Sequence, residues 1–417
     1  MAELPERIDD VRAQVDRIVA PQLDDEALSD AWARAVWSLI CEPGDGVAGH
    51  LVAALGAAEA LREVRAQASA RTVSRSPTLT AGLRRWLPRL QGMAVEGMFR
   101  TARFARLRLV TPNDPDWPRG LADLGVHAPI ALWVRGAGVA LHRDGPRVAL
   151  VGARACTPYG ELVSADLAAD LAESGVAVVS GAAFGIDAAA HRAALATGGT
   201  TIAVLAGGVD RPYPSSHSDL IAEIAEKGAV IGEVAPGAAP TKSRFLERNR
   251  VIAAMSDATV VVEAGWRSGS LNTAGHAAAL GRPLGAVPGP VTSAASTGCH
   301  RLLREFDATC VTSGAEIIEL TGWDNGAVGR RSTTSGDVAA PGDTPVSADA
   351  TDGTRDTGAA VLAAIDRRVR RPSDEIARRA GLTPSQVETQ LGLLELDGRV
   401  VREDSGWRRA AARQGRR

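Results

Sequence analysis

The stretch "RVALVGARACTPYGELVSADLAADLAESGVAVVS", residues 147–180, contains two apolar runs separated by an amphipathic helical pattern. The apolar runs are short enough for strands, and the intervening pattern ends at Gly175, a residue that favours helix termination. Parallel strands need a long crossover connection, which is usually a helix. The stretch therefore predicts a parallel β-α-β unit.

The same alternation continues to about residue 322. Further strand-like runs are "TTIAVLAGG" (200–208), "AVIGEVAPG" (229–237) and "DATVVVEAG" (257–265), and each is followed by a helical pattern. Uninterrupted apolar runs such as "TVVV" are typical of strands that are covered on both faces. We therefore expect a doubly wound α/β domain with a parallel sheet, extended at its start by short strands around the Pro-rich turn near 112–118, over 106–322 in total.

The flanking regions have different patterns. Apolar residues recur at helical spacing in "DEALSDAWARAVWSLI" (25–40), so we expect a helical domain over 1–105. Residues 323–357 have little apolar content and are predicted to be a disordered linker. Residues 358–410 read as three helices and two short strands, the pattern of a winged helix-turn-helix, and 411–417 form a basic tail.

Composition limits the function classes. The 417 residues carry a net charge of −2, so any polyanion site must be a local patch and not a general basic surface. The four cysteines show no metal-ligand spacing, which favours a reducing compartment. We find no signal peptide and no run long enough to span a membrane, and we therefore expect a cytoplasmic protein.

The strand-to-helix loops are the candidate functional elements, because ligands of open parallel sheets bind at the carboxyl ends of the strands. Five such loops are glycine-rich: 151–160, 180–187, 205–217, 233–250 and 263–275. None matches a dinucleotide or P-loop fingerprint, so we expect no nucleotide cofactor and no ATP hydrolysis. The glycines either expose backbone N–H groups to an anion or serve only tight turns and helix packing.

The loop 233–250 leads into "KSRFLERNRV" (242–251), which places four cations at the start of a predicted helix. Lys242, Arg244, Arg248 and Arg250 would oppose the helix dipole unless an anion lies there as well. Phe245 would offer a ring face to a nucleic-acid base. The alternative is a solvated basic turn with Phe245 in the core. Arg154, after the first strand, either faces the same edge or forms a structural salt bridge.

Catalytic and metal sites have weaker support. Ser180, Asp187 and His191 could suggest a triad, but Asp187 is expected to cap its own helix. The other histidines of this region, His217, His276 and His300, lack metal-ligand spacing. We therefore expect neither a catalytic group nor a metal site.

Six segments together resemble the DprA/Smf DNA-processing family over about 106–322. They are "VGARACTPYG" (151–160), "SGAAFGIDAAAH" (180–191), "TIAVLAGGVDRPYP" (201–214), "FLERNRVIAAMSDATVVVEA" (245–264), "RSGSLNTAGHAAALGRPLGAVPG" (267–289) and "STGCHRLL" (296–303). The resemblance implies an extended Rossmann-like core, a SAM-like N-terminal domain and a winged-helix C-terminal domain. It also implies a homodimer without catalysis that binds and protects single-stranded DNA and loads RecA onto it in natural transformation.

The resemblance assigns DNA contacts residue by residue. It implies contacts at Arg154, Ser180, Gly181, Gly185, Phe245, Arg248, Asn249 and Arg250, and we add Lys242 and Arg244 from charge alone. The sequence departs from the family pattern at Leu246, where proline is usual, and at His300, where asparagine is common.

Two other functions are compatible with the broad fold. Nucleoside-monophosphate phosphoribohydrolases need a glutamate on the helix that corresponds to "LNTAGHAAALGR" (271–282), which contains no acidic residue. A winged-helix transcription factor with a ligand-sensing α/β domain would instead bind duplex DNA through 358–409.

Overall fold

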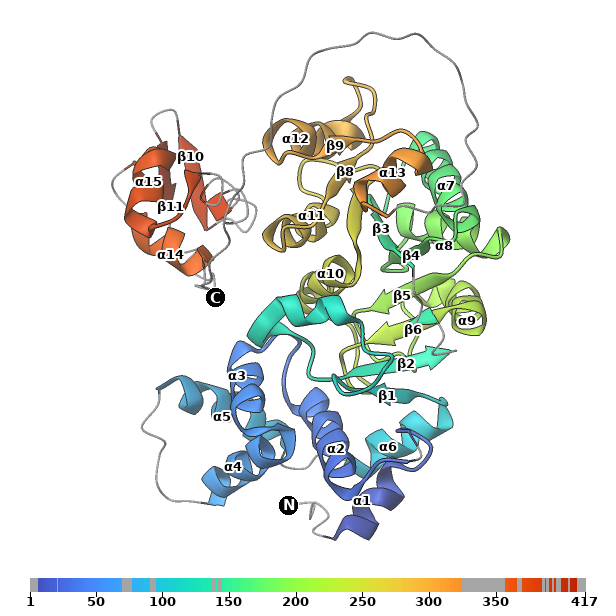
Figure 1. The fold of residues 1–417 in the computed structure, drawn as a ribbon, viewed down its shortest axis with the longest axis vertical. Helices are drawn as coiled ribbons and strands as arrows, with labels where there is room; N and C mark the ends of the chain where they lie inside the picture. Colours follow the sequence, from blue (N-terminus) through green and yellow to red (C-terminus); the bar gives the residue numbers. More distant parts are fainter. Residues whose placement is uncertain are drawn as a thin grey trace. The chain divides into compact units, whose positions relative to one another are not determined.

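The chain forms two units in the computed structural model, Met1–Trp323 and Asp324–Arg417 (Figure 1). The structure describes residues 7–323 apart from 21, 70–76, 91–94, 137–139 and 142–144, and in the second unit residues 357–365, 370–384, 387, 390–391, 394, 399–403 and 406–410. The predicted linker, except for its end residues, and the predicted basic tail lie outside the described residues. The domain boundaries predicted from the sequence remain predictions.

The described strands of the first unit form one nine-stranded sheet in the order β1-β2-β6-β5-β4-β3-β7-β8-β9. The strands are β1 (Arg108–Val110), β2 (Leu132–Gly136), β3 (Arg147–Val151), β4 (Ala177–Ser180), β5 (Thr201–Leu205), β6 (Ala229–Gly232), β7 (Ala258–Val261), β8 (Leu284–Ala286) and β9 (Thr309–Cys310). Strands β3 to β9 run parallel, whereas β2 pairs antiparallel with β6 and with β1. The doubly wound α/β fold predicted from the sequence is confirmed.

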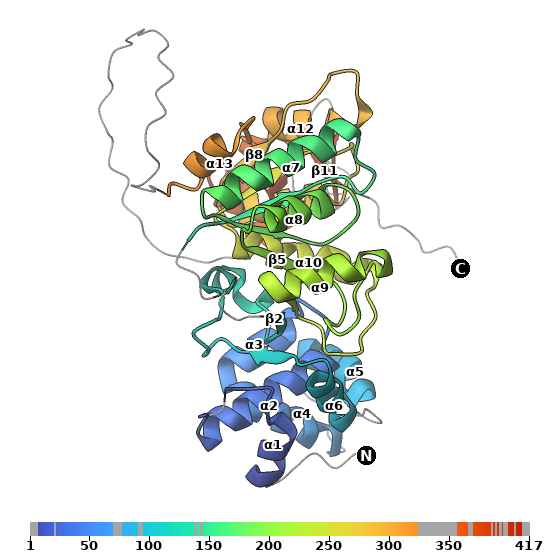
Figure 2. The same cartoon turned by 90° about the vertical axis from the view of Figure 1, so that its right-hand side faces the viewer.

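The helices lie on both faces of this sheet. They are α7 (Pro158–Glu173), α8 (Ile186–Ala196), α9 (Ser218–Lys227), α10 (Lys242–Met255), α11 (Ser270–Ala279), α12 (Thr297–Glu305) and α13 (Gly314–Leu320). Helices α7, α8 and α9 cover one face, whereas α10 and α11 cover the other (Figures 1 and 2). Right-handed crossovers require this change of face, because the chain moves outward from β3 to β6 and then returns to β7 on the opposite side of β3.

This reversal creates a switch point between β3 and β7. The two strands are paired in parallel, with Val151 opposite Val261 at their carboxyl ends. The loops that follow them therefore diverge from the same edge of the sheet, to α7 on one face and to α11 on the other. Such a crevice is the usual ligand site of open α/β sheets.

A helical module precedes the sheet. Its helices are α1 (Ile8–Val15), α2 (Asp25–Ile40), α3 (Gly46–Leu55), α4 (Ala57–Ser69), α5 (Pro77–Leu90) and α6 (Val95–Phe104). In the centre of this module, the rings of Trp37 and Trp86 pack edge to face, with 5.2 Å between the ring centroids. The same apolar cluster continues into Trp133 of β2 and Val230 of β6, so the module and the sheet share one core. The buried Trp133 indole donates to Ser38 Oγ at 3.0 Å across this junction.

The second unit has its own small core. It contains α14 (Thr357–Ala364), α15 (Ser373–Ala380) and an antiparallel pair formed by β10 (Val400–Glu403) and β11 (Gly406–Arg409). Val361, Ile376, Leu391 and Val400 are buried together. Helices followed by a two-stranded wing agree with the predicted winged helix, although the third predicted helix lies largely outside the described residues.

No helix of the described residues is long and apolar enough to cross a membrane. In the same residues, no group of three or more His, Cys, Asp and Glu side chains is arranged to hold a metal ion.

Candidate nucleic-acid interface

A cavity of about 790 Å³ opens at the switch point between β3 and β7. Its walls are the loop after β3 (151–155), the loop after β7 (265–270) and the face of α10 that begins at Lys242. The N-terminus of α10 lies at this cavity, so the positive end of the helix dipole adds to the charge of nearby side chains. The cavity is therefore suited to an anionic ligand.

Four cations line the cavity, and one of them, Arg267, is exposed in the loop after β7. Arg154 and Lys242 are exposed, whereas Arg248 is only 7% exposed. Arg248 Nη1 donates to the carbonyl oxygens of Gly181 (2.9 Å) and Val204, so this guanidinium joins α10 to the ends of β4 and β5. Burial lowers the pKa of Arg248 to about 10, and the charge of Arg154 acts in the same direction, while Asp187 opposes it. Arg154, Lys242 and Arg267 are therefore the exposed cations positioned to meet a ligand directly.

Phe245 has aromatic and cationic neighbours. The guanidinium carbon of Arg154 lies 4.8 Å from the centre of its ring, and the Tyr213 ring lies 5.6 Å away at 56°. Phe245 therefore lines the cavity, as expected, but one of its ring faces is already in contact with Arg154. The predicted contact between this ring and a base remains a prediction. Phe245 holds Arg154 in place by a cation–π contact.

Asn249 also lines the cavity, and its amide donates to Asn272 Oδ1 at 3.1 Å. The three predicted site residues of the second motif, Ser180, Gly181 and Gly185, are not among the residues that line the cavity. Ser180 is buried and donates to Leu150 O at 2.6 Å. Gly181 lies against Arg248, where a Cβ atom would come within 2.3 Å of Nη1. Gly185 has a φ of 74°, and a Cβ there would come within 2.3 Å of Ala153 O, so its role is to let two loops approach each other.

Asp187 does not cap its own helix, and the prediction that it does is wrong. Its carboxylate accepts the backbone N–H groups of Gly181 (3.1 Å) and Ala183 (3.3 Å), which belong to the preceding loop. Helix α8 begins after Gly185 without a side-chain cap. Burial raises the pKa of Asp187, while Arg248 and the two N–H groups oppose this effect. Asp187 thus shapes the loop beside the cavity.

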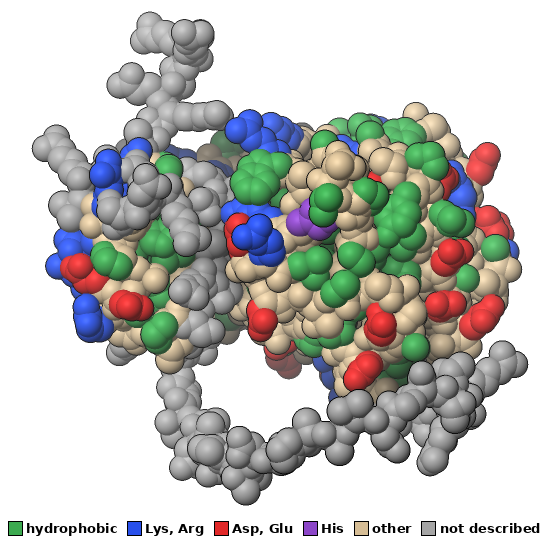
Figure 3. Space-filling view, turned by 90° about the horizontal axis from the view of Figure 1, so that it is seen from above, with side chains coloured by type: hydrophobic (Ala, Val, Ile, Leu, Met, Phe, Trp, Pro, Cys, Tyr) green, Lys and Arg blue, Asp and Glu red, His purple; other side chains and the backbone are tan. Residues whose placement is uncertain are grey.

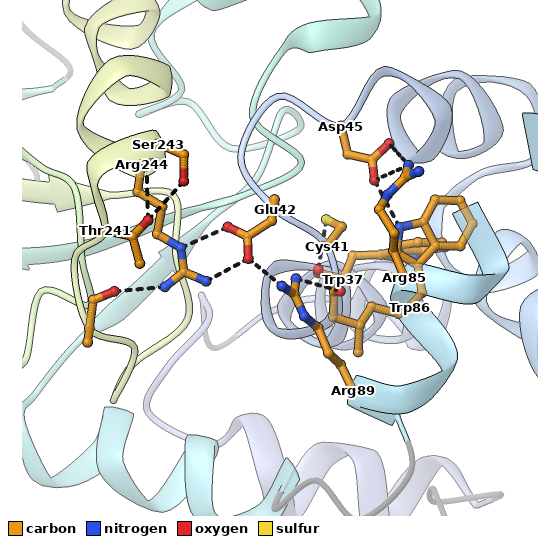
Figure 4. A network of polar contacts seen from close by, with 12 residues as sticks. Trp37, Cys41, Glu42, Asp45, Arg85, Trp86, Arg89, Thr241, Ser243 and Arg244 are labelled. Atoms are coloured by element: carbon orange, nitrogen blue, oxygen red, sulfur yellow. Dashed lines mark hydrogen bonds and ion pairs between the residues drawn. The ribbon is translucent and has the colours of Figure 1, made fainter. Parts of the chain in front are cut away.

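Arg244 and Arg250 point away from the cavity, toward the helical module, so the four cations of α10 do not form one cluster. Arg244 donates to Glu42 through Nε (2.8 Å) and Nη2 (3.0 Å), and Glu42 also pairs with Arg89 of α5 (Figure 4). Arg250 is 3% exposed and donates from Nη2 to both oxygens of Glu233 (2.7 and 2.8 Å).

These two arginines anchor the helical module on α10. Glu42 follows α2, and Glu233 also accepts the Gly44 N–H at 3.3 Å. Partial burial of Glu42 would raise its pKa, but the hydrogen bonds and charges of Arg244 and Arg89 outweigh this effect and hold the pKa below its usual range. Arg244 and Arg250 are thus paired with the carboxylates of Glu42 and Glu233, which explains why a chain of low net charge carries these two cations on α10.

Glu263 and three histidines near these loops have structural partners. Glu263 is buried and accepts the Thr157 N–H and hydroxyl, each at 2.7 Å, which ties the end of β7 to the start of α7. His191 Nδ1 lies 2.7 Å from Thr201 Oγ1, His217 Nδ1 lies 3.1 Å from Ala182 O, and His300 Nε2 lies 2.9 Å from Gly289 O. These contacts give each group a role in packing the loops.

Sequence reasoning missed two aromatic residues on the cavity wall, Tyr213 and Trp266. Both are exposed, at 49% and 57%. Tyr213 lies within a segment that had been quoted, and Trp266 immediately precedes one. The usable signal was an aromatic side chain in a glycine-rich loop at the carboxyl edge of the sheet, where burial in the core is not expected.

Charged and hydrophobic side chains are mixed at the end of the first unit near α12 and α13. Figure 3 views this end, where acidic side chains and scattered Lys and Arg side chains lie among hydrophobic ones. This mixed surface agrees with the net charge of −2.

Known protein families match both units. Residues 108–322 match the family described as DNA recombination-mediator protein A, and residues 344–406 match the DprA winged helix domain. The first match covers the whole nine-stranded sheet and its helices, including every wall of the cavity.

Individual relatives agree with this assignment. A Mycobacterium tuberculosis protein named putative DNA processing protein DprA is 47% identical over 320 residues, which cover 74% of this chain and 78% of that protein. Protein Smf of Escherichia coli is 38% identical over 67% of this chain and 71% of its own length. The X-ray structure of DNA processing protein A from Streptococcus pneumoniae superposes with a TM-score of 0.55 and 30% identity, covering 69% of this chain and 97% of that one.

Proposed function

Because the chain belongs to the DNA recombination-mediator protein A (DprA) family, we propose that it binds single-stranded DNA in the cavity between β3 and β7. In this proposal, the protein acts as a recombination mediator and does not catalyse a reaction. Arg154 and Lys242 are the proposed direct contacts to the sugar-phosphate strand. Arg248, Asn249 and Phe245 form the wall that positions them.

The observation that carries the proposal is the combination of cations and aromatic rings around one cavity. Arg154 and Lys242 are exposed beside Tyr213 and Trp266 at the N-terminus of α10. A charged groove with aromatic side chains is the usual means of holding a single strand, because unpaired bases can leave the strand and stack. The bases of a duplex are stacked on each other and cannot enter such a cavity.

The acidic groups favour binding over catalysis. Asp187 is the only carboxylate among the described residues that line the cavity, and it is buried against two backbone N–H groups. Hydrolysis at a sugar or phosphate usually needs a second carboxylate, a metal or an activated nucleophile. Release of a free base from a nucleoside monophosphate by the purified protein would contradict this part of the proposal.

Family membership supports further proposals about the cellular role. We propose that the protein is cytoplasmic and forms a homodimer. In the same proposal, it protects incoming single-stranded DNA and loads RecA onto it during natural transformation. The names of the relatives, which refer to DNA processing, support this role.

The test is a titration of a poly-dT oligomer and a duplex of equal length across a salt series. For the single strand, the logarithm of the affinity should fall with the logarithm of the salt concentration, with a slope of roughly −0.7 for each phosphate contacted. Arg154→Ala and Lys242→Ala should each weaken binding about tenfold and make this slope less steep by roughly 0.7.

Arg62→Ala is the matched control, because Arg62 is an exposed arginine on α4 in the helical module, away from the cavity. This variant should bind as the wild type does. Equal affinity of the wild type, Arg154→Ala and Lys242→Ala for the single strand would reject the site. Equal affinity of the wild type for duplex and single strand would reject the proposed strand preference.

A further inference from the structure

Trp266 is an exposed aromatic side chain on the cavity wall that no family motif quoted above includes. It lies in the loop between β7 and α11 and is 57% exposed. Exposure of a large indole leaves apolar surface in water, and large exposed aromatic groups in a concave site often mark ligand contact. The position of Trp266 at the switch point makes its exposure informative.

A cationic side chain contacts the Trp266 indole on one face. The guanidinium carbon of Arg301, on α12, lies 4.8 Å from the centre of the Trp266 ring. Arg301 is only 9% exposed, and its Nε donates to Glu305 at 2.8 Å. A buried and hydrogen-bonded cation therefore contacts one face of the indole and limits its movement. Because the side chain is still more than half exposed, surface remains for a second contact.

Phe245 is less available for the same role. Arg154 lies over its ring at 4.8 Å, and Tyr213 packs beside it at 5.6 Å. The two aromatic positions thus have different neighbours. The cation beside Phe245 is exposed and can reach a phosphate, whereas the cation beside Trp266 is buried and supports the ring. This difference favours Trp266 over Phe245 as the ring on which a base stacks, and the exposed Arg267 beside Trp266 can contact the neighbouring phosphate.

We propose that Trp266 is the surface on which one base of the bound single strand stacks, with Arg301 as a positioning residue behind it. This inference rests on the proposed function, because it takes single-stranded DNA as the ligand of the same cavity. It adds that affinity depends on the bases as well as on the phosphates. An indole stacks on any base, so little sequence preference follows.

The test measures the affinity of Trp266→Ala and Trp266→Phe for a poly-dT oligomer and for an abasic deoxyribose-phosphate strand of equal length. Loss of one stacked base should weaken poly-dT binding by Trp266→Ala about 5- to 150-fold, with Trp266→Phe in between. The abasic strand should bind equally to the wild type and to Trp266→Ala. Phe104→Ala removes a 90% exposed aromatic side chain at the end of α6 and should change neither affinity.

Tryptophan fluorescence supplies a second measurement. The chain has eight tryptophans, so the contribution of Trp266 is the difference between the wild type and Trp266→Phe. Poly-dT should quench this difference signal, and the abasic strand should leave it nearly unchanged.

The outcomes separate the two proposals. Unchanged poly-dT affinity in Trp266→Ala, together with weaker binding by Arg154→Ala, would overturn the role of Trp266 and leave the proposed function standing. Absence of single-strand binding by the wild type would overturn both.

Discussion

Replacing Arg250 with alanine should lower the free energy of unfolding by about 3–5 kcal/mol and leave the affinity for single-stranded DNA nearly unchanged. The guanidinium is 3% exposed and donates two hydrogen bonds to Glu233, at 2.7 and 2.8 Å. When the guanidinium is removed, the Glu233 carboxylate keeps one hydrogen bond among the described contacts. This bond is donated by the Gly44 N–H at 3.3 Å. The expected loss of unfolding free energy is this large because the partly buried Glu233 carboxylate has lost its cationic partner.

The expected change in melting temperature follows from the size of the unit. A unit of about 320 residues loses roughly 1.5 °C in melting temperature for each kcal/mol, so the Arg250→Ala midpoint should fall by about 4–8 °C. Thermal unfolding followed by circular dichroism measures this fall, and a poly-dT titration at a temperature where both proteins are folded measures the affinity.

A double variant provides the internal control. Arg250→Met with Glu233→Met removes both charges, so no unpaired ion is left buried, and the double variant should be more stable than Arg250→Ala. Arg154→Ala should show the opposite behaviour, with normal stability and weaker DNA binding. If Arg250→Ala retains its stability but binds the single strand weakly, the guanidinium belongs to the DNA site, as the sequence alone suggested.

Three further predictions concern the frame around the site. Gly185→Ala should lower stability by more than about 1 kcal/mol in denaturant titrations, because φ is 74° and a Cβ would lie 2.3 Å from Ala153 O; a neutral effect would contradict that geometry. Ser38→Ala leaves the buried Trp133 indole N–H without its acceptor and should lower the unfolding free energy of the first unit by about 1–3 kcal/mol, whereas a change confined to the helical module would argue against a shared core. Burial, together with the charges of Arg248 and His217, lowers the pKa of His191 to about 3, so the unfolded chain binds this proton near pH 6.5 and the folded chain does not. The stability of the wild type relative to His191→Asn should therefore fall as pH decreases from about 6.5 toward 3, by up to about 1.4 kcal/mol per pH unit, and a pH-independent difference would contradict the buried neutral imidazole.

Much of the architecture follows from local patterns in the chain. Apolar runs of strand length, separated by helical patterns, predicted a parallel sheet, and the position of the glycine-rich loops predicted a site at its carboxyl edge. The cavity lies at that edge and is lined by Arg154, Lys242, Phe245, Arg248 and Asn249, all of which had been predicted as site residues. These features could be predicted because strand and helix periodicities are local properties.

The roles of individual side chains depended on contacts between distant segments. Helical periodicity places Lys242, Phe245 and Asn249 on one face of α10 and leaves Arg244 and Arg250 outside that face. The partners of these two arginines cannot be read from the helix, because Glu42 lies 202 residues from Arg244. In the same way, Phe245 and Trp266 are both aromatic residues near a cation, but only the fold pairs one with an exposed arginine and the other with a buried one.

The sequence by itself determined the parallel sheet, the edge at which a ligand would bind and the family, because these depend on the order and spacing of short segments. The tertiary structure decided which arginines face the cavity and which hold the helical module. The charge and hydrogen-bond partners of a side chain come from residues that only folding brings within a few ångströms.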